Sequence, residues 1–267
     1  MHASAHSSQV GASSESLSRD YPAVALERDA ASGPLLLLCE HASPHVPVCY
    51  AGLGLDSSER ERHIGWDIGA LAMARELSEA LDSPLIYATQ SRLLMDLNRD
   101  PSAVDAIPAS SDGTTIPANQ NLSGAELQRR RLWLYEPFHA AVDALRARRM
   151  AQGLATAVVS IHSFTPQMAG FQRPWHIGVL SDTDRRLADS LLAVLRARPD
   201  VCVGDNQPYA PHQGVYHSVG RHGMQHGLPN VMIEVRNDLL QGDAAVKQWS
   251  QLLGHALRLA CSELGVR

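Results

Sequence analysis

The sequence has few cysteines, no long apolar run and little excess charge, and each shortage excludes a class of protein. Its four cysteines among 267 residues are widely spaced without a C-x-x-C motif, so neither a disulfide framework nor a zinc–thiolate site is indicated. The longest apolar run, Leu35–Cys39, is far shorter than the ~20 residues of a membrane-spanning helix. The formal net charge of -5 gives no reason to expect a nucleic acid or a membrane surface as partner.

The N-terminal segment is also poor in apolar residues. Residues 1–18 are rich in Ser, Ala and His, and they lack the charged region and apolar core of a signal peptide. We therefore predict a disordered tail over residues 1–33, a single domain over residues 34–267 and a cytoplasmic protein. With 45% hydrophobic residues, the remaining chain is long enough to bury a large core.

Strand and helix patterns alternate through this domain. The patterns predict apolar strands at residues 35–39, 85–89, 93–97, 157–161, 177–180 and 231–235, and helices at 58–82, 124–151, 185–194 and 246–264. Ser123 is the expected N-cap of the second helix, and Pro137 is expected to kink it. The alternation indicates an α/β fold, with a mostly parallel or mixed sheet covered by helices on both faces.

Polar residues stand where several of these strands end. Glu40 and His41 follow the first strand, His162 follows the strand at 157–161, and Glu234 lies near the end of the last one. Ligand sites of open α/β sheets lie beyond the carboxyl ends of the strands. We therefore expect these side chains to meet in one site, with the proline-containing loop at residues 100–123 forming part of its pocket.

His41 and His162 are the best candidates for metal ligands in that site. Neutral imidazole is a common zinc ligand, and catalytic zinc usually has three protein ligands and a water. Asp67 could be the third, oxygen ligand, and Glu40 is a fallback ligand or an acid. Other interpretations remain open here: each histidine as a hydrogen-bonded side chain at a strand end, and Asp67 as an acidic residue that favours the start of a helix.

Glu234 is the candidate general base. It is surrounded by apolar residues in the segment VMIEV, and a buried carboxylate is costly unless it is paired or bound to a metal. Burial and a metal would tune its pKa for proton transfer. The alternative is a buried ion pair with Arg236, two residues along the same strand.

The segment SRLLMDLNRDP offers groups that bind a substrate. Arg92 and Arg99 can bind a carboxylate or stabilise charge on a carbonyl oxygen, and Asn98 adds a donor. A solvated surface loop is the alternative. Among the histidines of the tract at residues 212–226, His222 is the candidate for a substrate contact. Ser163 is a poor candidate nucleophile because no G-x-S-x-G motif is present.

The order of motifs resembles the N-formylglutamate amidohydrolase family. From about residue 34 to about residue 240, the chain contains CEHAS-x-x-VP, HIGWDIGA, SRLLMDLNR, IHSFTP, DNQPY and HGLPNVMIEVRNDL in this order. This family is similar to the zinc carboxypeptidase and aspartoacylase-like hydrolases. The resemblance therefore implies a three-layer α/β/α sandwich and one Zn(II) ion.

The resemblance also implies roles for individual residues. His41 and His162 would bind zinc, and Glu234 would be the base. Asn98 and Arg99 would bind the substrate carboxylate, and Arg92 would polarise the carbonyl. The sequence departs from these relatives at one position: Pro44 stands where they have a glutamate ligand, three residues after the first histidine. We therefore expect the third ligand to be Asp67, in preference to Glu40.

The expected activity is metal-dependent hydrolysis of an N-acyl amino acid, in the first place of N-formyl-L-glutamate to formate and glutamate. Binding of glutamate needs a second cation, for which Arg236 and Arg173 are the candidates. The alternatives are a deacylase or carboxypeptidase with another substrate, and a non-catalytic metal-binding relative. The expected partner is a small molecule, and the sequence leaves the oligomeric state open.

Overall fold

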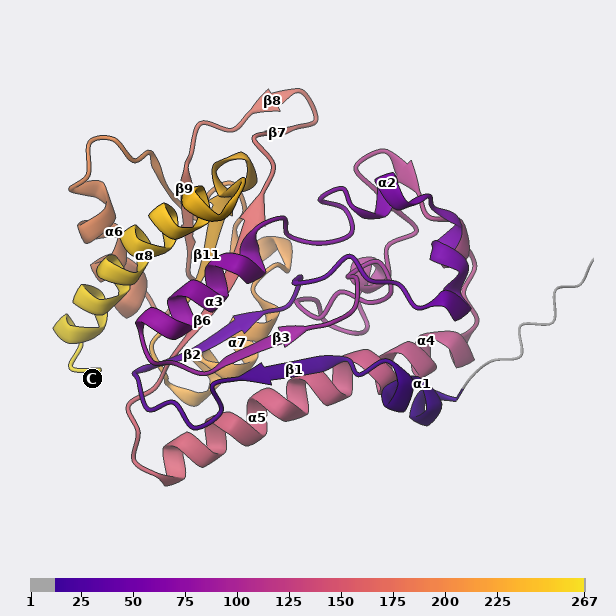
Figure 1. Ribbon diagram of the computed structural model, residues 1–267, viewed down its shortest axis with the longest axis horizontal. Helices are drawn as coiled ribbons and strands as arrows, with labels where there is room; N and C mark the ends of the chain where they lie inside the picture. The colour runs from indigo at the N-terminus through magenta and orange to yellow at the C-terminus, as the bar shows by residue number, and fades with distance from the viewer. Residues whose placement is uncertain (1–12, 267) are drawn as a thin grey trace, which may run out of the picture.

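Seven strands form one central sheet in the computed structural model, which describes residues 13–266 (Figure 1). Their order is β1-β3-β2-β6-β11-β9-β10. The four central strands β3, β2, β6 and β11 are parallel, whereas β1 and the β9–β10 pair run antiparallel to their neighbours β3 and β11. The strands are β1 (Val24–Glu27), β2 (Leu35–Cys39), β3 (Leu85–Ala88), β6 (Ala157–Phe164), β9 (Ile177–Leu180), β10 (Val203–Asp205) and β11 (Asn230–Arg236).

Helices cover both faces of this sheet, so the predicted three-layer α/β/α fold is confirmed. One face packs against α3 (Ala70–Ala80), α6 (Arg186–Arg196) and α8 (Asp243–Glu263), and the other packs against α5 (Glu136–Ala151) and α7 (His217–His222) (Figure 1). Helix α4 (Gly124–Arg130) precedes α5 and lies beside α1 (Ser14–Asp20), beyond the sheet. Strand β2 shows why a central strand is apolar throughout. Leu35 and Leu37 enter one core, and Leu36 and Leu38 enter the other, because successive side chains point to opposite faces.

The predicted tail is wrong over its described part. Helix α1 (Ser14–Asp20) and strand β1 lie within residues 13–33, and β1 pairs with β3 at the edge of the sheet. The buried Leu17 fixes α1 against the core. This edge strand is only partly buried, so its sequence lacks a clear apolar pattern. The rest of the predicted tail, residues 1–12, lies outside the described residues.

Other predictions fail where chain direction changes. The helix expected at 58–82 consists of α2 (Ser57–Arg60) and α3, with an irregular segment at residues 61–69 between them. Residues 93–97 form turns and no strand. The segment 100–123 contains the short hairpin β4 (Ser110–Ser111) and β5 (Thr114–Thr115) and two 3-10 turns, η2 (Val104–Ala106) and η3 (Pro117–Asn119).

The long helix at residues 124–151 exists in three parts. Ser123 accepts a hydrogen bond from Glu126 N and caps α4, as predicted. The π-helical turn η4 (Arg131–Tyr135) connects α4 to α5, and Pro137 lies in the first turn of α5. Proline is tolerated at this position, because the first backbone N–H groups of a helix have no acceptor within the helix and the missing N–H of proline breaks no hydrogen bond. No helix within residues 13–266 is long and apolar enough to cross a membrane.

The parallel strands place the polar residues at one edge of the sheet. In the register of β6 and β11, Glu234 lies opposite His162. Strand β2, on the other side of β6, ends one residue before Glu40. The hairpin β7 (Gln167–Met168) and β8 (Phe171–Gln172) follows β6 and projects beyond this edge, at the top of Figure 1.

Candidate active site

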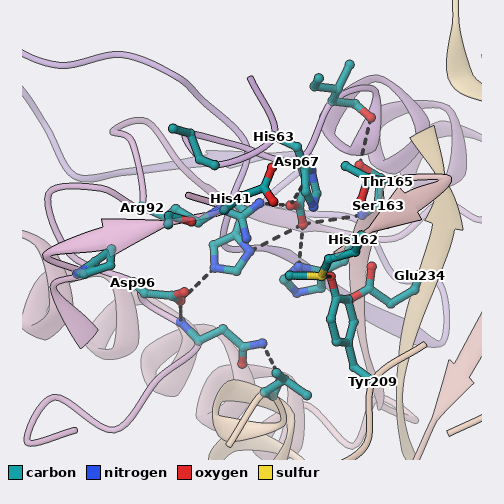
Figure 2. Close-up of a pocket in the computed structure, with 18 of the residues that line it drawn as sticks. His41, His63, Asp67, Arg92, Asp96, His162, Ser163, Thr165, Tyr209 and Glu234 are labelled. Carbon is teal, nitrogen blue, oxygen red and sulfur yellow. Dashed lines mark hydrogen bonds and ion pairs between the residues drawn. The ribbon is translucent and has the colours of Figure 1, made fainter. Parts of the chain in front are cut away.

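Three buried side chains form a group that could hold a metal ion. His41 follows β2, His162 lies in β6, and Asp67 lies in the irregular segment before α3. One ligand atom from each lies within 4.8 Å of the others. Asp67 Oδ2 is 2.7 Å from His162 Nδ1 and 3.4 Å from His41 Nδ1 (Figure 2). The Asp67 backbone N–H donates to the His41 carbonyl oxygen at 2.8 Å, which fixes this segment beside β2.

The second nitrogen of each imidazole faces a carboxylate. His41 Nε2 lies 2.7 Å from Asp96 Oδ1, and His162 Nε2 lies 3.1 Å from Glu40 Oε2. Ser160 donates to the same Glu40 oxygen at 2.6 Å. Metal-binding histidines commonly have such a carboxylate on their second nitrogen. Glu40 therefore lies behind the His162 ring, and only Asp67 of the two candidate carboxylates faces both histidines.

The protonation of the two histidines is compatible with a bound cation between them. Burial lowers the pKa of His41 to about 4, so its ring is neutral near pH 7. If His41 Nε2 donates its hydrogen to Asp96, a lone pair on Nδ1 faces Asp67. Burial also acts to lower the pKa of His162, but contact with the Glu40 carboxylate outweighs it and raises that pKa. A metal would replace the proton on His162 Nδ1, so two imidazole lone pairs and one carboxylate would converge on it.

The second oxygen of Asp67 binds Arg92. Arg92 Nη2 donates to Asp67 Oδ1, and His63 Nδ1 lies 3.6 Å from the same oxygen. The buried Nε of Arg92 has no hydrogen-bond partner. Burial lowers the pKa of this guanidinium. Arg92 therefore has one donor held by the metal-binding group and one buried donor without a partner.

Glu234 is a buried carboxylate beside this group. It is 3% exposed, and its Oε2 has no hydrogen-bond partner among the described residues. Burial raises its pKa, although the nearby His162 and Arg92 act in the opposite direction. The alternative ion pair with Arg236 is absent, because Arg236 Nε donates to Asp238 Oδ1 at 2.8 Å. Glu234 thus combines burial, a raised pKa and an unused oxygen.

A cavity of about 520 Å³ joins these groups (Figure 2). The loop at residues 100–123 contributes to its wall through Asp105, Pro108, Ser110, Ser111 and Asp112, as predicted. The predicted site residues that line the cavity are His41, Asp67, Arg92, Asn98, Arg99, His162 and Glu234. The sequence patterns therefore converge on one cavity from five separate segments of the chain.

The predicted carboxylate-binding residues lie in this wall, with contacts of their own. Asn98 Oδ1 accepts from Ser218 N at 3.0 Å, and its Nδ2 donates to the Val215 carbonyl oxygen. Arg99 Nη1 donates to the Gln213 carbonyl oxygen and lies 3.4 Å from Asp105. Asn98 therefore also ties this segment to α7.

His222 and Arg236 do not line the cavity, which corrects the expectation of substrate contacts for both. His222 is fully buried in α7, where its ring contacts His139 and Asp143. Arg236 is held by Asp238 and by the Arg173 carbonyl oxygen. A histidine-rich tract gave no signal that one of its members would be enclosed by a neighbouring helix.

Several cavity residues were not assigned from the sequence. Asp96 had no role beside Arg92, although its carboxylate orients His41. Burial acts to raise the pKa of Asp96, but the charges of His41 and Arg92 outweigh it and lower that pKa. His63 and Tyr209 also line the cavity (Figure 2). The motifs HIGWDIGA and DNQPY contain them, and this was the only signal available.

The fold and the cavity define the chain as an α/β protein with a buried polar cluster at the ends of its strands. The family model of N-formylglutamate amidohydrolase matches residues 33–241. The chain belongs to the N-formylglutamate amidohydrolase family, as the sequence motifs indicated.

Two solved structures share the fold. The crystal structure of a gene product from Agrobacterium tumefaciens is 42% identical, with a TM-score of 0.89 over 91% of this chain and 96% of that one. The structure of N-formylglutamate amidohydrolase from Ralstonia eutropha JMP134 is 22% identical, with a TM-score of 0.68 over 89% of this chain and 97% of that one. No curated protein matches this sequence.

Proposed function

We propose that this protein is a zinc-dependent amidohydrolase that cleaves N-acyl amino acids, in the first place N-formyl-L-glutamate to formate and glutamate. The observation that carries the proposal is the convergence of the His41, Asp67 and His162 ligand atoms with the unpaired Glu234 carboxylate in one cavity. Membership of the family supports the amide bond as the target.

His41, Asp67 and His162 would hold the one metal ion. Two imidazoles and one carboxylate form a donor set used by catalytic zinc. Asp96 contacts the outer nitrogen of His41 at 2.7 Å, and Glu40 lies 3.1 Å from that of His162. A bound zinc would supply Lewis acidity, which polarises an amide carbonyl and acidifies water. The remaining work of the reaction falls to the side chains of the cavity.

Glu234 is proposed to move the protons. As a carboxylate it would take a proton from the attacking water, and as a carboxylic acid it would pass one to the leaving amine. A general base works best when its pKa approaches the working pH, and burial raises the pKa of Glu234 in that direction. Its unpaired Oε2 is the oxygen that would contact the water.

Arg92, Asn98 and Arg99 are proposed to bind the substrate. The free Nε of Arg92 can donate to the carbonyl oxygen as negative charge develops on it. Arg99, next to Asn98, would bind the α-carboxylate through its remaining donors. Arg99 Nη1 is held by the Gln213 carbonyl oxygen, so the guanidinium is already oriented before a ligand arrives.

One observation favours a second candidate within the same chemistry. The cavity of about 520 Å³ falls in the size range of pockets that bury drug-sized ligands. A formyl group leaves much of such a space empty, so a deacylase with a larger N-acyl substrate or a carboxypeptidase for short peptides is the alternative.

The first experiment is to measure glutamate release from N-formyl-L-glutamate before chelation, after chelation and after zinc is restored. We expect activity to disappear with the chelator and to return with zinc. Activity that survives complete metal removal would contradict the metal-dependent mechanism. Activity only with larger N-acyl amino acids or peptides would support the alternative substrates.

The second experiment separates the base from the metal ligands. Glu234→Gln keeps the shape of the side chain and removes the proton acceptor, so we expect kcat to fall by about a thousandfold while bound zinc stays unchanged. Zinc content and kcat should be measured on the same preparation. A variant with near-normal turnover would show that another group is the base.

A further inference from the structure

Arg173 is a buried arginine beside the cavity that has no carboxylate partner. It is 6% exposed, and within residues 13–266 it forms no ion pair. Its guanidinium donates through Nη1 to Thr165, at 3.3 Å to the carbonyl oxygen and 3.2 Å to Oγ1, and through Nη2 to Met168 Sδ at 2.8 Å. A thioether is a weak acceptor, so one face of the cation is poorly satisfied.

The other deeply buried arginines of the described chain are satisfied fully. Arg149 donates to the carbonyl oxygens of Ala31, Gly33 and Ala155 and to Thr156 Oγ1. Arg130 pairs with the Glu126 carboxylate and also donates to Asn119 Oδ1 and the Leu94 carbonyl oxygen. Both lie away from the residues that line the cavity, whereas Arg173 contacts three of those residues. A purely structural role would predict similar saturation at Arg173, and the contrast indicates that its missing partner comes from outside the chain.

Arg173 lies directly behind the cavity wall, although it is not itself a lining residue. Thr165, Met168 and Tyr209 contact the guanidinium and also line the cavity. The cation lies 4.8 Å from the centre of the Tyr209 ring and 5.7 Å from that of Phe164. These rings hold the planar group in place through cation–π contacts. The Met168 side chain, on the projecting β7–β8 hairpin, is the acceptor opposite Nη2.

We propose that Arg173 binds the side-chain carboxylate of a dicarboxylic N-acyl amino acid, a role that rests on the function proposed above. A carboxylate oxygen would displace the Met168 sulfur from Nη2 and neutralise the buried charge. Arg99 would then bind the α-carboxylate, and Arg173 would select glutamate or a close homologue over neutral side chains. Of the two cations first considered for this task, Arg236 already has Asp238 as its partner.

The test compares two substrates that differ only in the group Arg173 would bind, N-formyl-L-glutamate and N-formyl-L-glutamine. Arg173→Met keeps an unbranched apolar stem beside the two rings and removes the charge. We expect its kcat/KM for the glutamate substrate to fall about 100-fold, the size of a lost charge-assisted hydrogen bond, with less than a threefold change for the glutamine substrate. Arg173→Lys should recover part of the preference.

Arg185→Met is the matched control, because it removes the same charge from a surface arginine paired with Asp189 and Asp205. It should leave the substrate preference unchanged. Equal losses on both substrates in Arg173→Met would overturn the proposal and show a structural role for the arginine. A wild-type protein that does not prefer the glutamate substrate would overturn it as well.

A binding measurement separates failure of this proposal from failure of the proposed reaction. If the wild-type protein hydrolyses neither substrate, calorimetry with glutarate and with its monoamide still tests the carboxylate site. Tighter binding of glutarate to the wild type, lost in Arg173→Met, would support the site in a protein of different activity. Equal binding of the two probes would refute it.

Discussion

The protein contains two pairs of buried histidines, and the pairs differ in the groups that face their ring nitrogens. His41 and His162 are edge to face, with ring centres 4.8 Å apart and carboxylates on both outer nitrogens. His139 and His222 are stacked, with centres 5.0 Å apart. The first pair lines the cavity, and the second is enclosed between α5 and α7.

The second pair is a closed chain of contacts. His139 Nε2 lies 3.0 Å from the Leu97 carbonyl oxygen, His139 Nδ1 lies 2.7 Å from His222 Nε2, and His222 Nδ1 lies 3.1 Å from Asp143 Oδ1. Both ends are acceptors only, so the three contacts need three hydrogens. Two neutral rings supply two, and a single proton would complete the chain.

The pair at the site lacks more hydrogens for its contacts than the second pair does. Asp96, Asp67 and Glu40 are all acceptors, and together they make four contacts with His41 and His162. Two neutral rings again supply two hydrogens. When the outer nitrogens carry these two hydrogens, the two contacts that lack a hydrogen are both at Asp67, where a divalent cation fits. The comparison teaches that a histidine's role follows from what its second nitrogen faces, and the residue type alone does not reveal it.

The largest expected difference between the pairs is in metal binding. His162→Ala removes a proposed ligand, so we expect bound zinc to fall from about one ion per chain to nearly none, and turnover to fall more than about a thousandfold. His222→Ala should lower stability by about 2–4 kcal/mol and leave zinc content unchanged. Metal analysis and denaturant unfolding check both results. Loss of zinc in His222→Ala alone would reverse the assignment of the two pairs.

A smaller effect is expected from the outer carboxylates. Asp96→Asn weakens the contact that orients His41, and loss of such a partner lowers metal affinity by about 10- to 100-fold. Asp143→Asn makes the same change beside His222 and should not alter metal affinity. Competition with a chelator of known affinity measures both. Equal affinities in the two variants would show that Asp96 does not orient a ligand.

The smallest effect expected is on the pH dependence of stability. Burial lowers the pKa of His222 from 6.5 to about 4, so an unfolded chain takes up this proton before the folded one does. The folded state therefore loses stability as the pH falls from 6.5 towards 4. Between pH 7.5 and pH 5, His222→Gln should lose about 2 kcal/mol less than the wild type. Parallel urea unfolding curves at both pH values check this, and identical losses would exclude a titrating His222.

The parts of the fold that depend on local pattern could be predicted from the sequence. The runs at Leu35–Cys39 and at residues 231–233 are apolar because both faces of those strands are buried, and this composition is visible without coordinates. The edge strand β1 is exposed on one side, so no such pattern marks it. Residues 61–69 also follow helical spacing, but the positive φ of Gly69 and the Asp67–His41 backbone contact interrupt the helix.

The site could be predicted where residue type and strand end coincide. His41, His162 and Glu234 were found in this way, and Pro44 directed the choice of Asp67. The partners of Arg236 and His222 could not be foreseen, because Asp238 lies in a short turn and Asp143 lies about 80 residues before His222. Contacts between distant segments are set by the packing of helices, which a single sequence does not record.

The parallel pairing of β6 and β11 has a further consequence for the enzyme. Glu234 and His162 face each other through a ladder of backbone hydrogen bonds. A slip of one residue would turn every side chain of β11 to the opposite face of the sheet and leave the base in the wrong layer. Chains with the wrong register would therefore have no activity at all, rather than a reduced or altered one. Activity requires the native register of β6 and β11, so we expect it to be lost together with the native sheet during unfolding.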